Sequence, residues 1–172
     1  MFTERFNSFV CAGDAITCET GGFIVSARII PDDCPDAPDQ RQEGFWPSLY
    51  KDAPGFIGEP DEELVRGTNS PANGNNFRAR FAKAQAEAEA LMAGWRKGEW
   101  FYCGVVLSVS LEGVELAPHA ASLWGLEANY PGSENEALTR AANTLIPEAL
   151  AEAGRVLTRL AALAPGGEGG RA

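Results

Sequence analysis

This 172-residue chain has little of what most enzymes use for chemistry. It holds one histidine, His119, and its four cysteines occur singly, without a CxxC pair. Zinc sites use clustered Cys and His residues, so no zinc-binding pattern is present. His119 would have to act as a base toward Cys103 or Ser122, but no nucleophile elbow surrounds either residue. We therefore expect no enzymatic activity, no metal and no cofactor, and we expect mostly buried thiols in a reducing compartment.

Positive charge and long apolar runs are also scarce. Fourteen Lys and Arg residues stand against 24 Asp and Glu residues, which gives a formal net charge of −10. Such a chain repels phosphate, so we expect no direct binding of nucleic acid or of an anionic membrane and favour a basic protein as the partner. No run approaches the length of a transmembrane helix, and Met1–Arg5 lacks the pattern of a signal peptide. These features predict a cytoplasmic location.

Most of the negative charge falls in one proline-rich segment, residues 31–63, which we call the acidic arm. It holds ten acidic residues against Arg41 and Lys51, so it carries −8 of the net charge of −10. Its six prolines prevent long regular elements. The predicted partner-binding residues are the carboxylates and neighbouring aromatic residues of this arm: Asp32, Asp33, Asp36, Asp39, Glu43, Phe45, Trp46, Glu59, Asp61, Glu62 and Glu63.

Carboxylates interleaved with aromatic side chains favour a protein contact. Charge attraction accelerates the encounter, and buried aromatic residues anchor the complex. A row of carboxylates can also imitate the spacing of nucleic-acid phosphates and so occupy a basic channel in another protein. Two competing interpretations are a solvated loop and a weak cation site at Asp32, Asp33, Asp36 and Asp39. Their spacing does not reproduce the twelve-residue calcium loop.

The apolar patterns predict strands and helices in one domain. Residues 14–20 and 23–30 flank Gly21-Gly22 and predict a β-hairpin. Residues 99–110 carry the strongest strand signal, with Cys103, Val105, Leu107 and Val109 on a face that we expect to be buried. A strand is favoured over a helical turn for residues 120–129.

Helical periodicity covers residues 75–97 and 134–163. Pro147 interrupts the second segment, so we expect either a kink or two abutting helices there. The predicted fold class is α+β, a two-layer arrangement in which two or three helices, including the one at 75–97, pack on an antiparallel sheet. Residues 1–163 are expected to form a single domain with an insertion at about 31–67, followed by a flexible tail at 164–172.

Two blocks resemble a family of small uncharacterised proteins that occur on bacteriophages, plasmids and other mobile elements of proteobacteria. They are Glu99–Ser110 (EWFYCGVVLSVS) and His119–Ser133 (HAASLWGLEANYPGS). Phe2–Phe6 and Gly22–Arg28 are similar to that family as well. The resemblance implies an accessory gene of a mobile element, and it transfers no catalytic residue. Because the blocks lie outside the acidic arm, the Trp100 and Trp124 region is a second place where function could reside.

These observations together predict a non-enzymatic acidic interaction protein of a phage or mobile element. By analogy with other small acidic proteins of mobile elements, it would inhibit host CRISPR or restriction machinery. It would do so by docking on a basic, nucleic-acid-handling host protein, with DNA mimicry as one mode. Two alternatives stay open. One is a small metal-dependent or His119-dependent enzyme. The other is a structural homo-oligomer, such as a homodimer, in which copies associate through the apolar stripe along a helix.

Overall fold

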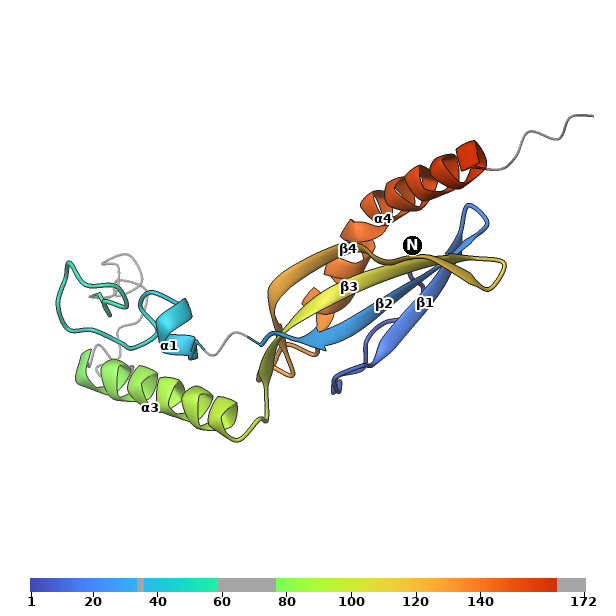
Figure 1. Ribbon diagram of the computed structural model, residues 1–172. Helices are drawn as coiled ribbons and strands as arrows, with labels where there is room; N and C mark the ends of the chain where they lie inside the picture. Colours follow the sequence, from blue (N-terminus) through green and yellow to red (C-terminus); the bar gives the residue numbers. More distant parts are fainter. Residues whose placement is uncertain (34–35, 59–76, 164–172) are drawn as a thin grey trace, which may run out of the picture. The chain divides into compact units, whose positions relative to one another are not determined.

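An antiparallel sheet with the strand order β1-β2-β3-β4 organises the computed structural model, which describes residues 1–33, 36–58 and 77–163 (Figure 1). β1 (Ala15–Thr20) and β2 (Phe23–Pro31) pair so that Thr20 lies opposite Phe23. The two residues between them, Gly21 and Gly22, both have positive φ, which glycine adopts without steric cost. The predicted two-residue hairpin is confirmed.

The strands that follow residue 99 form the other half of the sheet. β3 (Phe101–Leu111) pairs with β2 and continues through a tight turn into β4 (Val114–Ala128). The strand predicted for residues 120–129 is confirmed as the second half of β4. Three register shifts interrupt the β3–β4 ladder, so β4 is an irregular edge strand of the kind that resists further pairing.

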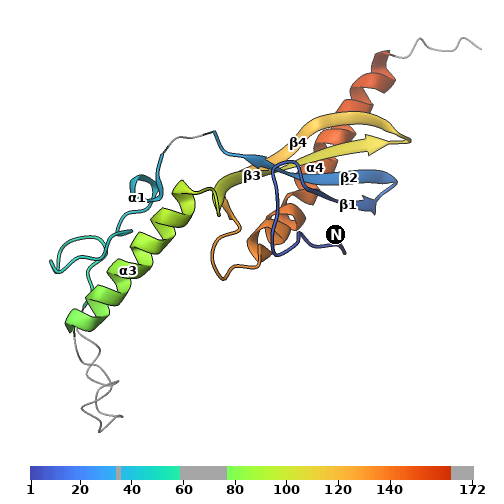
Figure 2. The same cartoon turned by 90° about the horizontal axis from the view of Figure 1, so that it is seen from below.

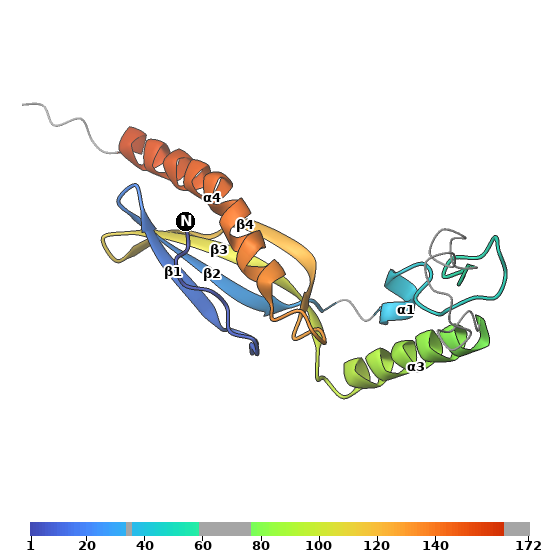
Figure 3. The same cartoon turned by 180° about the vertical axis from the view of Figure 1, so that it is seen from behind.

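One face of the sheet is buried by α4 (Glu136–Leu163), which packs mainly on β4 and β3 (Figure 3). The four β3 residues predicted for the buried face are all fully enclosed: Cys103, Val105, Leu107 and Val109. Leu138, Ala142, Ala149 and Ala153 of α4 complete this core. The α+β fold class, with a helix packed on an antiparallel sheet, is therefore confirmed.

Pro147 lies inside α4 without dividing it. The helix is continuous from Glu136 to Leu163, so the alternative of two abutting helices is wrong. Pro147 is exposed, and the carbonyl group that it leaves without a helical partner can therefore bond to water. The buried positions on either side, Ile146 and Ala149, face the sheet without interruption.

The N-terminal segment lies along α4 and extends the core. Phe2, Phe6 and Val10 are buried at intervals of four residues. The backbone N–H groups of these residues donate to side chains far along the chain, at Asn143, Thr139 and Asn129 respectively, over 2.8, 3.1 and 2.8 Å. The amide of Asn135, only 1% exposed, donates to two further carbonyl groups of the segment. These bonds fix a segment that has no regular secondary structure.

The chain divides by contacts into two compact units, one formed by Met1–Asp32 with Trp100–Ala172 and the other by Asp33–Glu99. The second unit contains α1 (Pro38–Arg41) and α3 (Phe77–Arg96), both seen in Figure 2. The helix predicted at 75–97 is confirmed from Phe77 to Arg96, and residues 75 and 76 lie outside the described residues. Gly98, two residues after the helix end, has a positive φ, as glycine allows. The contacts place α3 in the same unit as residues 33–58 of the acidic arm.

Candidate functional site

The structure distributes the predicted site residues over both units. Asp32 is half-buried in the first unit, where its N–H donates to the Tyr102 carbonyl group at 2.9 Å. Asp33, Asp36, Asp39 and Glu43 are exposed and belong to the second unit. The remaining acids of the prediction lie outside the described residues: Glu59, Asp61, Glu62 and Glu63. The described part of the candidate site in the second unit is therefore mainly the stretch 36–58 of the arm.

Residues 44–58 form a closed loop. The Ser48 N–H donates to the Gly55 carbonyl group at 2.8 Å, and the Ile57 N–H donates to the Ser48 carbonyl group at 3.0 Å. Gly44 and Gly55 approach so closely that a Cβ on Gly44 would lie 2.5 Å from the Gly55 nitrogen. Only glycine fits at such a crossing of two backbones. The loop thus holds a defined shape despite its lack of regular structure.

Trp46 is fixed at the base of this loop. Its indole Nε1–H donates to Asp39 Oδ2 at 3.1 Å, which ties the loop to α1. The Phe45 ring lies edge-on to the indole, with 5.2 Å between the ring centroids and planes inclined by 85°. This is a favourable aromatic geometry. Phe45 and Trp46 therefore pack against each other, and Trp46 keeps 36% of its surface exposed.

The loop displays more apolar surface than the sequence indicated. Beside Trp46, Leu49 is 54% exposed, Tyr50 80% and Phe56 37%. Leu49 and Tyr50 were missing from the predicted site, although Tyr50 stands next to the charged pair Lys51-Asp52 in a typical turn composition. We call Trp46, Leu49, Tyr50 and Phe56 the exposed quartet. Asp39, Glu43 and Asp52 neighbour it in the sequence, so apolar and acidic groups share one short loop.

The negative field of the arm is diluted within its own unit. Residues 33–99 contain twelve acidic and eight basic residues, a net charge of −4. One of the bases, Arg80 of α3, donates from Nη2 to the Gly58 carbonyl group at the end of the loop. The charge of −8 counted for residues 31–63 alone therefore overstates the negative charge of this unit. Short-range contacts are correspondingly more important for recognition than long-range charge attraction.

The structure keeps two of the candidate catalytic residues, Cys103 and His119, apart. Cys103 lies in the sheet core, where burial, and then the charge of Asp32, raises the pKa of its thiol to about 12. A thiol with that pKa is protonated at neutral pH and is a poor nucleophile. His119 is exposed on β4, near the level of Ser108 on the paired strand β3. At about 3.3 Å per residue, this level lies about 16 Å along β3 from Cys103. His119 and Cys103 therefore do not form a catalytic pair.

The aromatic block of the first unit is mostly a packing feature. Trp100 is 1% exposed, and its ring lies edge-on to those of Tyr102 and Tyr130, at 5.3 and 5.1 Å between centroids. Trp124 is 48% exposed, and its ring covers Gly104, where a Cβ would lie 2.5 Å from the indole. Trp100 and Trp124, which mark the second region where function could reside, thus differ widely in accessibility.

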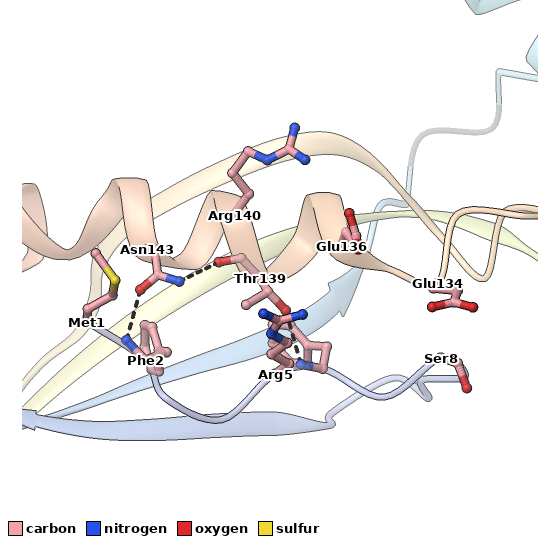
Figure 4. A pocket seen from close by; sticks show the side chains of 10 residues that line it. Met1, Phe2, Arg5, Ser8, Glu134, Glu136, Thr139, Arg140 and Asn143 are labelled. Carbon is pink, nitrogen blue, oxygen red and sulfur yellow. Dashed lines mark hydrogen bonds between the residues drawn. The ribbon is translucent and has the colours of Figure 1, made fainter.

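Residues of the N-terminal segment and of α4 together line a hollow of about 480 Å³ (Figure 4). Its lining carries charges of both signs, Arg5 and Arg140 together with Glu134 and Glu136. Figure 4 shows Arg140 directed away from the N-terminal segment. Two polar side chains that line it, Asn143 and Thr139, already accept hydrogen bonds from the backbone of the segment. This hollow is therefore part of the interface between the segment and α4.

No protein-family model, no curated protein and no solved structure matches the chain. Among residues 1–33, 36–58 and 77–163, no three His, Cys, Asp or Glu side chains are grouped so that they could hold a metal ion. Within the same ranges, no helix combines the length and the hydropathy needed to cross a bilayer.

Proposed function

We propose that this chain is a binding protein that docks its acidic arm on a basic surface of another protein. The observation that carries the proposal is the exposed quartet, four large apolar side chains displayed on one closed loop. Clustered exposed apolar residues mark contact sites, and Trp and Tyr are the residue types most often found to dominate binding energy. The neighbouring carboxylates select a partner of opposite charge.

The closed loop supports this proposal on entropic grounds. A segment that must be ordered on binding loses affinity, because its conformational freedom disappears at that moment. Here the Ser48–Gly55 hydrogen bond and the crossing at Gly44 shape the loop before any partner is present. The proposed contact therefore involves little additional ordering of the backbone.

The partner class follows from the charge and from the resemblance to mobile-element proteins. We propose a basic, nucleic-acid-handling protein of the host cytoplasm, bound as an inhibitor of a CRISPR or restriction system. In the described part of the arm, Arg41 and Lys51 interrupt the carboxylates, and apolar side chains occupy the loop. These features favour apolar anchors steered by carboxylates over imitation of a regular phosphate row.

Quantitative capture from host lysate tests the proposal. One variant carries Asp36→Asn, Asp39→Asn and Glu43→Gln in the arm. Its matched control neutralises three exposed acids of the first unit: Glu19, Glu112 and Glu115, each changed to Gln. We expect the arm variant to capture at least tenfold less of a basic protein, and the control to capture as much as the unaltered chain. Equal capture by both variants contradicts the proposal.

A second candidate, self-association, is favoured by the end of α4. Burial against the sheet ends at Ala153, whereas Leu160 and Leu163, further along the helix, are 51% and 79% exposed. A second copy could cover this apolar surface. Sedimentation velocity on the chain and on its Leu160→Glu variant separates the cases: a dimer that the substitution dissolves supports self-association, and a monomer at all concentrations excludes it.

A further inference from the structure

The charge distribution of the second unit gives short-range contacts a large role in recognition. Its net charge is −4, with twelve acids against eight bases, and interactions between exposed charges are screened beyond about 8 Å at physiological salt. An electrostatic field of this size attracts any cation and distinguishes poorly between arginine and lysine. Discrimination must come from groups that touch the partner.

Trp46 and Asp39 provide such groups. The indole Nε1–H is engaged with Asp39 Oδ2, and Phe45 holds the ring edge-on, so the indole has a fixed orientation while 36% of Trp46 is accessible. A carboxylate therefore lies at the edge of an accessible aromatic ring. Tyr50, with 80% of its surface exposed, adds a second aromatic ring on the same loop.

The two basic side chains differ in how well they fit such a surface. The arginine guanidinium group is planar and weakly hydrated, so it stacks on an aromatic ring while its N–H groups reach a neighbouring carboxylate. The lysine ammonium group is a compact, strongly hydrated charge that gains less from the ring. We infer that the arm recognises arginine side chains of its partner in preference to lysine, with Trp46 as the stacking ring and Asp39 and Glu43 as the acceptors. This inference rests on the proposed docking of the arm.

Two defined probes test the preference without knowledge of the partner. Fluorescently labelled nona-arginine and nona-lysine peptides are titrated with the full chain, and their dissociation constants are measured by anisotropy at physiological salt. We expect nona-arginine to bind at least about threefold more tightly, since one exposed cation–π contact corresponds to roughly a twofold to fivefold change in affinity.

Substitutions at position 46 assign the preference to the ring. Trp46→Leu removes the aromatic face and should reduce the ratio of the two constants to near one. Trp46→Phe keeps an aromatic face without the Nε1–H and should retain the ratio, even if the loop is loosened by loss of the Asp39 hydrogen bond. Trp124→Leu is the matched control in the first unit, where the indole is 48% exposed, and it should retain the ratio.

The outcomes separate this inference from the proposed function. Equal binding of the two peptides, with both weakened by Asp39→Asn together with Glu43→Gln, overturns the arginine preference and leaves acidic docking intact. A preference that survives in Trp46→Leu also overturns the inference, because the ring then plays no part. Binding that is absent, or unaffected by neutralising the arm, overturns both.

Discussion

Gly55→Ala is expected to open the loop of the acidic arm while the first unit stays folded. Gly55 has φ +78°, and the left-handed conformation costs an L-residue about 1–2 kcal/mol. The new Cβ would lie 2.3 Å from the Trp46 carbonyl oxygen, a backbone atom that cannot rotate away. Such overpacking costs about 1–3 kcal/mol more. The combined penalty of about 2–5 kcal/mol corresponds to a shift toward the open loop of roughly 30-fold to several thousand-fold.

Hydrogen exchange measures this opening directly. The amides of Ser48 and Ile57 are bonded across the closed loop, so their exchange should accelerate in Gly55→Ala while amides of β2 and β3 are unchanged. Gly58→Ala is the matched control, because a Cβ there meets its nearest atom, Phe56 Cε1, at an ordinary 3.5 Å. Exchange of Ser48 and Ile57 within twofold of the unaltered chain would refute the closed-loop argument.

Three further predictions concern the first unit. Asn135→Ala removes a buried side-chain amide that donates hydrogen bonds to the N-terminal segment. The substitution should lower the free energy of unfolding by about 2–3 kcal/mol and the melting temperature by about 5–10 °C. An unchanged melting temperature contradicts the role of this amide. Iodoacetamide at pH 8 should label the exposed Cys11 and spare Cys103, whose pKa burial raises to about 12; mass spectrometry that finds equal labelling opposes this. Burial also raises the pKa of Glu127, so the folded chain binds this proton more tightly than the unfolded chain and loses stability as the pH rises through the raised value. In denaturant titrations, Glu127→Gln should therefore be modestly stabilising at pH 7 and neutral below a pH of about 4. The reverse pH dependence contradicts this prediction.

Local patterns were sufficient to predict the strands. The Gly21-Gly22 pair and the period-two pattern of β3 depend on neighbours in the sequence, and both predictions were confirmed. The N-terminal segment gave no such signal, because it has no regular structure of its own. Its burial depends on Asn129 and Asn135, more than a hundred residues away. Long-range side-chain contacts of this kind cannot be inferred from a single sequence.

The candidate site was predicted in part. Charge and aromatic composition pointed to Asp39, Glu43 and Trp46, and the structure places these residues in or beside one loop. Leu49 and Tyr50 were missed, because their exposure follows from the close approach of two glycines eleven residues apart. The apolar stripe of the helix at 75–97 indicates that one helix face is buried, but it does not identify the element that covers this face.

Site-specific photo-cross-linking in the host cell tests the central claim most directly. A photo-reactive phenylalanine analogue replaces Tyr50, which is 80% exposed in the acidic arm, or, as a control, Val114, which is 62% exposed in the first unit. The proposed docking predicts a covalent adduct with a basic protein from position 50 and no such adduct from position 114. An absence of adducts at position 50, or the same adduct from both positions, would contradict docking through the arm.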